Sequence, residues 1–559
     1  MHNKHHIRHL IFSSIFLLAL SSCGIRKSLN SLPDISGYNA NIPERTAIND
    51  STFFVGNNFL TKNKQGLWEL YVEGDPLERG LIAGLLSEEL MYKQEAVFLN
   101  KIESLVPSEG QQKFLRKFLS WYNRKMYKHV PEEFQSELYG ISRYMSDDYD
   151  AIATPYLRAL YLHGAHDIAH ALQDLALVGC TSFAAWDGKT EDGGLLIGRN
   201  FDFYAGDDFA ENKVVSFINP HKGYKFMSIS WSGFIGVVSG MNEKGLTVTI
   251  NAGKSKIPWI AKTPISILTR EILQYACTIE EAIAIAKKRE VFVSEAIMVS
   301  SAKDRKAVLI EVSPKDFGVY NVNNSDELIC SNHFQSDPYR KDRRNKKTIQ
   351  NSHSQYRYDR MAQLLDEKEK LNPEKAVSIL RNTNGLDDKA IGYGNEKALN
   401  QLLAHHGIVF KPEELKVWVS ANPYQLGEFV AYDLNTVFSD RQGNPSAVTL
   451  SNPKLNIPKD PFLTTETYRN YEMYRVLEAK VEHALNHKEK LDDSTLQKLS
   501  HLNPKYWKAY YLAGLYFYNH KDYHKALKNF EVASEKEIAT QLEADKVSKY
   551  LKKSKRKAR

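Results

Sequence analysis

Cysteine is scarce in this chain, with four residues among 559, and their spacings match no zinc-binding motif. We therefore expect no metal, and no motif points to a cofactor. Basic residues form no stripe interleaved with aromatic residues, so the formal net charge of +7 gives little reason to expect a nucleic-acid partner. Beyond the first 20 residues, no segment has the length of a transmembrane helix. What remains is ordinary for a soluble globular protein of two or more domains, with 42% hydrophobic and 25% charged residues.

The first residues are typical of a targeting segment. Arg8 precedes an apolar run over residues 10–20, and the sequence Leu20-Ser21-Ser22-Cys23-Gly24 follows it. This pattern is similar to a bacterial lipoprotein signal, in which the cysteine is lipidated and becomes the mature N-terminus. We predict a signal peptide over residues 1–22, a lipid anchor at Cys23 and a polar linker over residues 23–60. The protein would then be tethered to a membrane of the bacterial cell envelope; the alternative is a generic or uncleaved signal peptide.

Three cysteines remain if Cys23 carries a lipid, and three thiols cannot all pair. Cys277 falls within an amphipathic helical pattern, so we expect it in the core. Cys330 ends an apolar strand. The sequence leaves a disulfide between Cys277 and Cys330 as one alternative, and this pairing would leave Cys180 free.

Residues 61–179 have a mainly helical pattern, in which large apolar side chains recur at helical spacing. Within this part, His163, His166 and His170 fall on one helical face. Such a face can ligate a metal, but no further ligand is evident nearby. We expect a packed, partly polar helix face instead.

From residue 180 the pattern changes to short apolar or β-branched segments, such as residues 181–186 and 327–330, which are separated by Gly, Asn and Asp. Helices near residues 264–288 and 354–381 interrupt the strands. This order favours two sheets covered by helices over alternating βαβ units, with residues 180–455 as the catalytic part. Residues 460–559 are helical and include a match to a tetratricopeptide-type hairpin, which we expect to be a structural cap rather than a protein-binding array.

Cys180 follows a glycine at the start of the strand-rich part, and we predict that it is a nucleophile. The thiolate is the reactive form, whereas a free thiol with a pKa of about 8.5 is mostly protonated at neutral pH. An N-terminal nucleophile passes its proton to its own α-amino group, whose pKa is about 7.7–8.0. For Cys180 this scheme requires cleavage of the bond to Gly179. Glycine fits that role because it permits the strained backbone that such a cleavage demands.

Five motifs follow one another in the order of a known family. They are Gly179-Cys180-Thr181-Ser182, Gly198-Arg199-Asn200-Phe201-Asp202, Met241-Asn242-Glu243-Lys244-Gly245-Leu246 leading to Asn251, Ser331-Asn332-His333-Phe334, and Ser354-Gln355-Tyr356-Arg357. As a set they resemble the penicillin acyltransferase family (peptidase family C45), which is related to choloylglycine hydrolases and acid ceramidase. The resemblance spans roughly residues 75–435. It implies an α+β chain with the four-layer αββα fold of N-terminal nucleophile hydrolases, followed here by an all-α helical-repeat extension.

The resemblance also implies self-cleavage into two chains and cleavage or transfer of acyl groups at amide bonds. Cys180 would attack the carbonyl and form a thioester, and Arg199 and Asp202 would hold and polarise the new terminal amine and thiol. The structural alternative is an ion pair of Arg199 with Asp202 that closes the hairpin. We do not expect Asp202 to act as a base, because a neighbouring guanidinium favours its charged form.

Further roles fall on residues from later motifs. Asn251 and Asn332 match positions that support the oxyanion and the substrate, although asparagines at strand ends are often turn formers. Arg357 would stabilise the site, and Arg360, one helical turn on, competes for this role. His333 is a candidate base of the papain type, but its position in the resembled family flanks the oxyanion residue.

Three hypotheses follow from these residues. The first is a lipid-anchored, self-processing cysteine hydrolase that cleaves linear amides, with acyl transfer as a further reaction. The second is an envelope scaffold that has lost activity and binds a protein partner through its C-terminal helices. The third is a papain-like protease that uses Cys180 and His333. The substrate stays open among bile-acid conjugates, N-acyl amino acids, acylated lipids, β-lactam side chains and peptides.

Overall fold

The computed structural model describes residues 27–28, 31–172, 179–255, 258, 260–366, 369–439 and 449–559. Cys23 and the predicted signal peptide lie outside the described residues. Within the described ranges, no helix combines the length and apolar character needed to cross a membrane.

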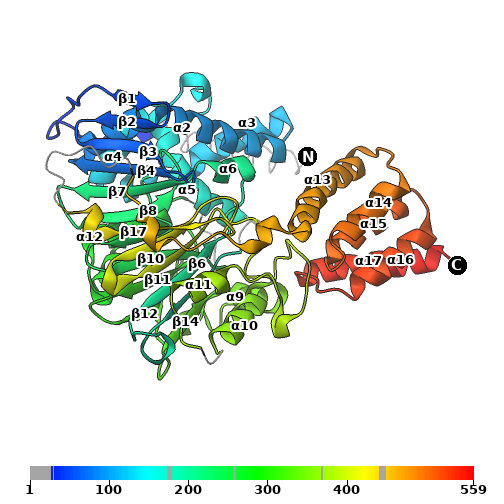
Figure 1. Cartoon of the computed structure of the whole chain (residues 1–559). Helices are drawn as coiled ribbons and strands as arrows, with labels where there is room; N and C mark the ends of the chain where they lie inside the picture. Colours follow the sequence, from blue (N-terminus) through cyan, green and yellow to red (C-terminus); the bar gives the residue numbers. More distant parts are fainter. Residues whose placement is uncertain are drawn as a thin grey trace, which may run out of the picture.

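Two sheets form the centre of the protein (Figure 1). The larger sheet has the strand order β1-β2-β3-β4-β7-β8-β9-β10-β11-β12-β13, and the smaller has the order β14-β5-β6-β15-β16-β17. The larger sheet consists of β1 (Thr46–Asn49), β2 (Thr52–Val55), β3 (Asn58–Lys62), β4 (Trp68–Gly74), β7 (Val214–Pro220), β8 (Phe226–Ser230), β9 (Ser239–Asn242), β10 (Leu246–Ala252), β11 (Glu295–Ser301), β12 (Lys306–Val312) and β13 (Phe317–Tyr320). The smaller consists of β14 (Glu327–Cys330), β5 (Thr181–Ala185), β6 (Leu196–Phe201), β15 (His406–Lys411), β16 (Lys416–Ser420) and β17 (Phe429–Asp433).

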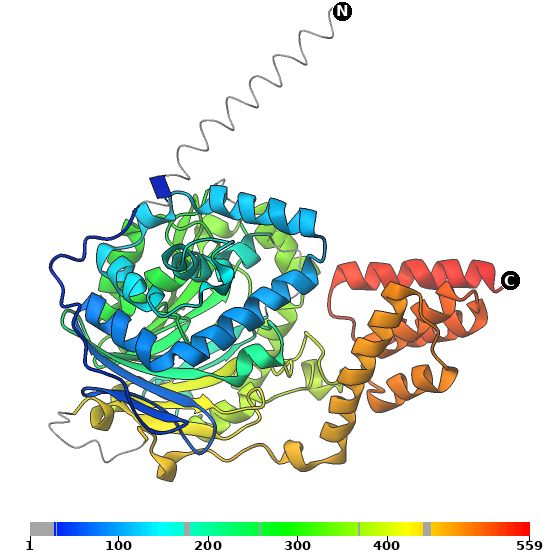
Figure 2. The ribbon, with the colours of Figure 1, turned by 90° about the horizontal axis from the view of Figure 1, so that it is seen from above.

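Helices cover the outer face of each sheet (Figure 2). On the side of the larger sheet lie α2 (Pro76–Leu105), α3 (Glu109–Asn123), α4 (Glu132–Ser142), α5 (Pro155–Leu172), α6 (Asp207–Glu211), α7 (Ile265–Tyr275) and α8 (Ile279–Lys288). The chain also forms α9 (Arg343–Asn351), α10 (Ser354–Leu365), α11 (Pro373–Leu380) and α12 (Leu434–Val437), of which α10 and α11 pack against the smaller sheet.

Three apolar layers hold these elements together. Between the sheets, Phe217 and Met298 of the larger sheet meet Ile408 and Val419 of the smaller one. A second layer joins the larger sheet to α2, α7 and α8, and a third joins the smaller sheet to α10 and α11. The strands contribute apolar side chains to both of their faces. The four layers confirm the predicted αββα fold.

The N-terminal part departs from the prediction, because residues 46–74 form four strands of the larger sheet. We expected a linker up to residue 60 and a mainly helical part from residue 61. Along β4, Trp68, Leu70 and Val72 pack toward the helices, whereas Tyr71 packs between the sheets. This period of two suits a strand with two apolar faces, and β4 completes it by pairing in parallel with β7.

His163 is part of a packed helix face, as expected. Its ring is buried and stacks on Phe234, with ring centroids 4.6 Å apart. The backbone N–H of Ile235 donates to its Nε2 (2.9 Å), and its Nδ1 lies 2.8 Å from the carbonyl oxygen of Ala159. Burial lowers the pKa of His163 to about 4, so the ring is neutral. The side chains of His166 and His170 lie outside the described residues.

Cys277 is not in the core, and this corrects the prediction. The residue is half-buried in the connection between α7 and α8, where its N–H donates to Glu281 Oε2 over 2.7 Å. The helical pattern ends before it, because α7 stops at Tyr275. Cys330 is buried at the end of β14, and both thiols are free, as is Cys180.

The C-terminal helices form a body beside the two sheets (Figures 1 and 2). They are α13 (Glu466–His487), α14 (Asp493–Leu502), α15 (Trp507–Asn519), α16 (Tyr523–Ser534) and α17 (Gln541–Lys557). Their common core also takes in Leu402 and Leu426 from the catalytic part. The helical extension is therefore packed against the catalytic part, whereas its tetratricopeptide character stays a prediction.

Candidate active site

A strand hairpin brings the first site residues together. Cys180 comes directly before β5, which pairs antiparallel with β6 in a register that places Thr181 opposite Asn200 and Ser182 opposite Arg199. The N–H of Gly179 lies 3.4 Å from the carbonyl oxygen of Asp202. The return strand therefore delivers a guanidinium and a carboxyl group to the start of the hairpin.

Cys180 is fully buried, with its Sγ 3.8 Å from Nη2 of Arg199. Burial raises the pKa of its thiol to about 11, and the lowering effect of the Arg199 charge does not compensate. The thiol is thus protonated at neutral pH while the bond to Gly179 is intact. An acceptor for its proton is needed before it can attack.

Arg199 is a buried cation whose donors are directed to oxygen atoms of the larger sheet. Nη1 donates to the carbonyl oxygen of Val238 (2.8 Å) and to Ser239 Oγ, and Nη2 donates to the carbonyl oxygen of Ile250. The guanidinium also lies over the ring of Phe201, 4.4 Å from its centroid. These contacts fix a positive charge next to the sulfur, in place of the ion pair with Asp202 considered from the sequence.

Asp202 is fully buried, and this changes its expected chemistry. Burial raises the pKa of its carboxyl to about 7, although the guanidiniums of Arg357 and Arg199 act in the opposite direction. Its Oδ2 accepts from Gln401 Nε2 over 3.3 Å, and its Oδ1 has no hydrogen-bond partner in the described part of the chain. The guanidiniums favour the charged form, as expected, but loss of solvent outweighs them, so the pKa of the carboxyl is raised instead of lowered. A carboxyl that titrates near neutrality can accept a proton.

The raised pKa of Asp202 predicts a pH-dependent stability effect. A group whose pKa rises on folding adds stability that is fully present below its ordinary pKa of 3.8 and is lost as the pH rises through about 7. In a Cys180→Ala background, Asp202→Asn should therefore become progressively more stabilising with pH. Asp202→Asn should increase the free energy of unfolding, and we expect this increase to be about 2–4 kcal/mol larger at about pH 8 than at about pH 4. Chemical unfolding at the two pH values measures it. A pH-independent difference would contradict the raised pKa.

Arg357 connects the hairpin to α10. It is fully buried, and its Nη1 donates to the carbonyl oxygen of Cys180 over 2.8 Å and to Thr181 Oγ1. Its Nη2 donates to Asn332 Oδ1 over 2.6 Å. Arg360 lies one turn further and instead binds Asn382 (3.3 Å) and Asp388. The structure thus places Arg357 in the site and Arg360 outside it.

Asn251 and Asn332 complete the network. Asn332 Nδ2 donates to the carbonyl oxygen of Ala252 (3.0 Å), and Asn251 Nδ2 donates to that of Cys330 (3.2 Å). Asn251 Oδ1 accepts from Ser182 Oγ over 2.8 Å. Both asparagines tie neighbouring strands to the hairpin rather than forming turns. All six residues predicted for the site thereby lie close together, at the ends of β5 and β6, on β10, in the loop after β14 and on α10.

His333 is not positioned as a base for Cys180. Its Nδ1 lies 2.8 Å from Ser354 Oγ, which also accepts from the N–H of Asn332 over 2.8 Å. Burial, followed by the charge of Arg357, lowers the pKa of His333 to about 4. The ring is therefore neutral and has a structural contact with Ser354 at the start of α10.

Several residues of this region were not predicted from the sequence. Gln401 reaches the carbonyl oxygen of Gly179 as well as Asp202, and Ser239 Oγ lies 2.9 Å from His406 Nε2 while it accepts from Arg199. Glu295 is a buried carboxylic acid whose pKa is raised well above its ordinary value by burial and by Asp167. No local motif marks these positions, because tertiary folding alone brings them to the hairpin.

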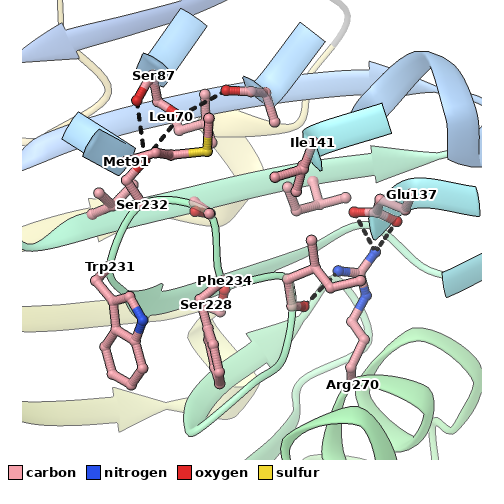
Figure 3. A pocket seen from close by; sticks show the side chains of 16 residues that line it. Leu70, Ser87, Met91, Glu137, Ile141, Ser228, Trp231, Ser232, Phe234 and Arg270 are labelled. Atoms are coloured by element: carbon pink, nitrogen blue, oxygen red, sulfur yellow. Dashed lines mark hydrogen bonds and ion pairs between the residues drawn. The ribbon is translucent and has the colours of Figure 1, made fainter. Parts of the chain in front are cut away.

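A largely apolar pocket lies between α2 and the loop that follows β8 (Figure 3). A second pocket shares Met91 and Phe234 with it and extends along Phe98, Phe209 and Phe203. Phe203, in the lining of this second pocket, is the residue that follows Asp202. In the wall of the first, Arg270 Nη2 lies 3.2 Å from Glu137 Oε2, and Ser232 Oγ lies 2.9 Å from Ser87 Oγ. A space lined mainly by aromatic and aliphatic side chains suits an apolar group.

Comparison with known proteins supports the sequence resemblance. Residues 189–423 match the family model of acyl-coenzyme A:6-aminopenicillanic acid acyl-transferase. The chain is 27% identical over 274 residues to an uncharacterized protein of Archaeoglobus fulgidus, a match that covers 45% of each chain. It is 25% identical over 194 residues to protein dcd1B of Dictyostelium discoideum, covering 33% of this chain and 35% of the relative. The matched segments span less than half the length of these relatives.

Two solved structures were also found to be similar. One is a Caenorhabditis elegans ortholog of N-acylethanolamine-hydrolyzing acid amidase, with 18% identity, a TM-score of 0.32 and coverage of 42% of this chain and 93% of that chain. The other is a mutant of conjugated bile acid hydrolase from Clostridium perfringens, with 15% identity, a TM-score of 0.32 and coverage of 47% and 94%. The family match over residues 189–423 agrees with the recognition made from the motifs. Cys180 itself lies just before the matched segment.

Proposed function

We propose that this chain, whose residues 189–423 match the acyl-coenzyme A:6-aminopenicillanic acid acyl-transferase family, is a self-processing cysteine hydrolase of linear amides. Cleavage between Gly179 and Cys180 would expose the catalytic amine, and Cys180 would then carry the acyl group as a thioester. The observation that carries this proposal is the buried Cys180 thiol, which lies 3.8 Å from the Arg199 guanidinium, is influenced by the charge of Asp202 and is directly preceded by a glycine.

Turnover would begin with proton transfer from the Cys180 thiol to its own α-amino group. The thiolate attacks the substrate carbonyl, and the carbon–nitrogen bond breaks as the α-ammonium returns the proton to the leaving amine. Water then cleaves the thioester to release the acid, or a second amine accepts the acyl group. Arg199 favours the thiolate, and the amide groups of Asn251 and Asn332 support the oxyanion, as the family resemblance implies.

The pocket beside Phe203 supports an apolar acyl group. Its lining includes Phe98, Phe209, Trp231 and Phe234, together with Phe203, the residue that follows Asp202. Burial of apolar substrate surface against such side chains contributes about 25 cal/mol per Å² to binding. We therefore propose a linear amide whose acyl part is apolar and fills this pocket.

The site of action is proposed from the N-terminal pattern alone. A lipid on Cys23 would hold the catalytic part at a membrane of the bacterial envelope, with the intervening residues as a tether. The C-terminal helices remain available as a surface for a protein partner. An inactive scaffold is the less favoured function, because all six predicted catalytic residues are present and connected.

A panel of N-acyl amides with graded acyl chains tests the activity and separates it from a papain-like mechanism. The native chain should release amine from at least one apolar acyl amide. Because His333 is neutral and bonded to Ser354, His333→Ala should keep turnover within about tenfold of native. Amine release is measured on the folded variants. Complete loss of activity in His333→Ala, with an uncut native chain, would instead favour the papain-like mechanism.

A further inference from the structure

Gln401 makes a contact that neither the motifs nor the family match assigns. Its side chain is buried, and its Nε2 donates to the carbonyl oxygen of Gly179 over 2.9 Å. The same nitrogen lies 3.3 Å from Oδ2 of Asp202. The carbonyl of Gly179 belongs to the bond whose cleavage we propose, so Gln401 places a hydrogen-bond donor on the group that Cys180 would attack.

The absence of a side chain at Gly179 leaves room for the contact with Gln401. A Cβ at position 179 would overlap with Nε2 of Gln401, and its φ does not lie in the left-handed region that favours glycine. The sequence suggested that this glycine serves a strained backbone. The structure gives a different reason, because only a residue without a side chain lets the amide of Gln401 approach the carbonyl so closely.

We propose that Gln401 stabilises the oxyanion that forms on Gly179 during self-cleavage. This inference rests on the proposed self-processing. In the first step Asp202 takes the thiol proton, and Cys180 Sγ forms a bond to the Gly179 carbonyl carbon, which moves negative charge onto its oxygen. The Gln401 N–H already points at that oxygen, which is the preorganisation that such a donor requires.

In the remaining steps the proton leaves Asp202 and the two chains separate. The tetrahedral intermediate collapses, the bond from Gly179 carbon to Cys180 nitrogen breaks, and the nitrogen takes the proton from Asp202. A water molecule then hydrolyses the thioester and leaves a carboxyl group on Gly179 and a free thiol on Cys180. After cleavage, the Gly179 carbonyl to which Gln401 donates is part of a carboxyl group and no longer of an amide. Gln401 therefore acts on maturation and not on later turnover.

The C-terminal helices hold the segment that presents Gln401. Asn503 Nδ2 donates to the carbonyl oxygen of Tyr393 (2.8 Å), and its Oδ1 accepts from the N–H of Tyr393 (3.2 Å). Lys397 Nζ lies 2.6 Å from Glu537, whose carbonyl oxygen accepts from Asn395 Nδ2 over 2.9 Å. The helical extension thereby acts as a positioning element for the Gln401 segment.

Substitution of Gln401 tests the inference by the rate of chain cleavage. Gln401→Met keeps the side-chain volume and removes the donor, so cleavage should slow by about 10²–10³-fold, which is the usual effect of losing one oxyanion donor. Turnover per cut chain should change by less than about tenfold. Gln425→Met is the matched control, because Gln425 is also buried and its side-chain nitrogen and oxygen have no hydrogen-bond partner in the described residues. It should cleave at the native rate.

The outcomes separate this inference from the proposed function. A native chain that is never cleaved would refute the proposed self-processing itself. Native cleavage with an equally fast Gln401→Met variant would overturn the role of Gln401 alone. Equal unfolding transitions of the variants in a Cys180→Ala background show that the slow cleavage is not a folding defect. If Gln401→Met fails to fold, Gln401→Ala removes the donor with a smaller side chain and must give the same slowing.

A double variant tests the positioning role of the helices. Asn503→Ala removes both contacts to Tyr393 and should slow cleavage by about 3–10-fold, in line with the loss of two neutral hydrogen bonds at a distance from the chemistry. If Asn503→Ala acts through Gln401, the double variant Asn503→Ala/Gln401→Met should cleave no more slowly than Gln401→Met alone. Multiplicative slowing in the double variant would show that the helices do not act through Gln401.

Discussion

Cys180→Ala is expected to leave the chain in one piece and to lower amide turnover by about 10⁴–10⁶-fold, the usual effect of removing a nucleophile that acts with its partners as a unit. Both losses have one cause, because the same sulfur would attack Gly179 during maturation and the substrate afterwards. Denaturing electrophoresis measures the first effect, and amine release from the most reactive amide of the panel measures the second.

Cys277→Ala is the control for this substitution. Cys277 is a free, half-buried thiol between α7 and α8 and has no contact with the site. Its loss should change neither chain cleavage nor turnover. A native chain that stays uncut, together with undiminished turnover after Cys180→Ala, would refute the cysteine mechanism.

Arg357→Leu has the second largest expected effect. The guanidinium donates to the carbonyl oxygen of Cys180, to Thr181 Oγ1 and to Asn332 Oδ1, all of them buried. Its loss leaves these acceptors unsatisfied, at about 1–3 kcal/mol for each group. It also removes the hydrogen bond that holds Asn332 in the position from which we propose it supports the oxyanion. We expect turnover per folded molecule to fall by about 10²–10³-fold, with a lower unfolding midpoint.

Arg360→Leu provides the comparison on the same helix. Arg360 is nearly as buried as Arg357, but it contacts Asp388 and Asn382 outside the site. Its substitution should lower stability with little change in turnover per folded molecule. Equal losses of turnover in the two variants would mean that Arg357 acts only through the packing of α10.

The sequence predicted the catalytic part of the fold well where the pattern was local. The strand expected over residues 327–330 is β14, and the strand expected over residues 181–186 is β5 (Thr181–Ala185). Residues 46–74 were misjudged because short strands preceding helices lack a strong local signal, and pairing of β4 with β7 far along the chain stabilises them.

The six residues singled out in the sequence lie together in the structure, but the electrostatics of this cluster were not predictable. Ordered motifs identified Arg357 over Arg360 as the family position, and the structure agrees. The pKa of Asp202 depends on complete burial, which the sequence does not show, and the contact of Gln401 with Gly179 joins residues far apart in the chain. Properties set by burial and long-range packing therefore needed the structure.

Mass spectrometry of the purified mature protein tests the central claim most directly. Self-processing predicts a chain whose new N-terminal residue is Cys180 with a free α-amino group, together with a partner chain that ends at Gly179. Both masses should be absent from the Cys180→Ala protein. An active native protein in which Gly179 and Cys180 remain joined would contradict the claim, since the α-amino group that accepts the thiol proton would then not exist.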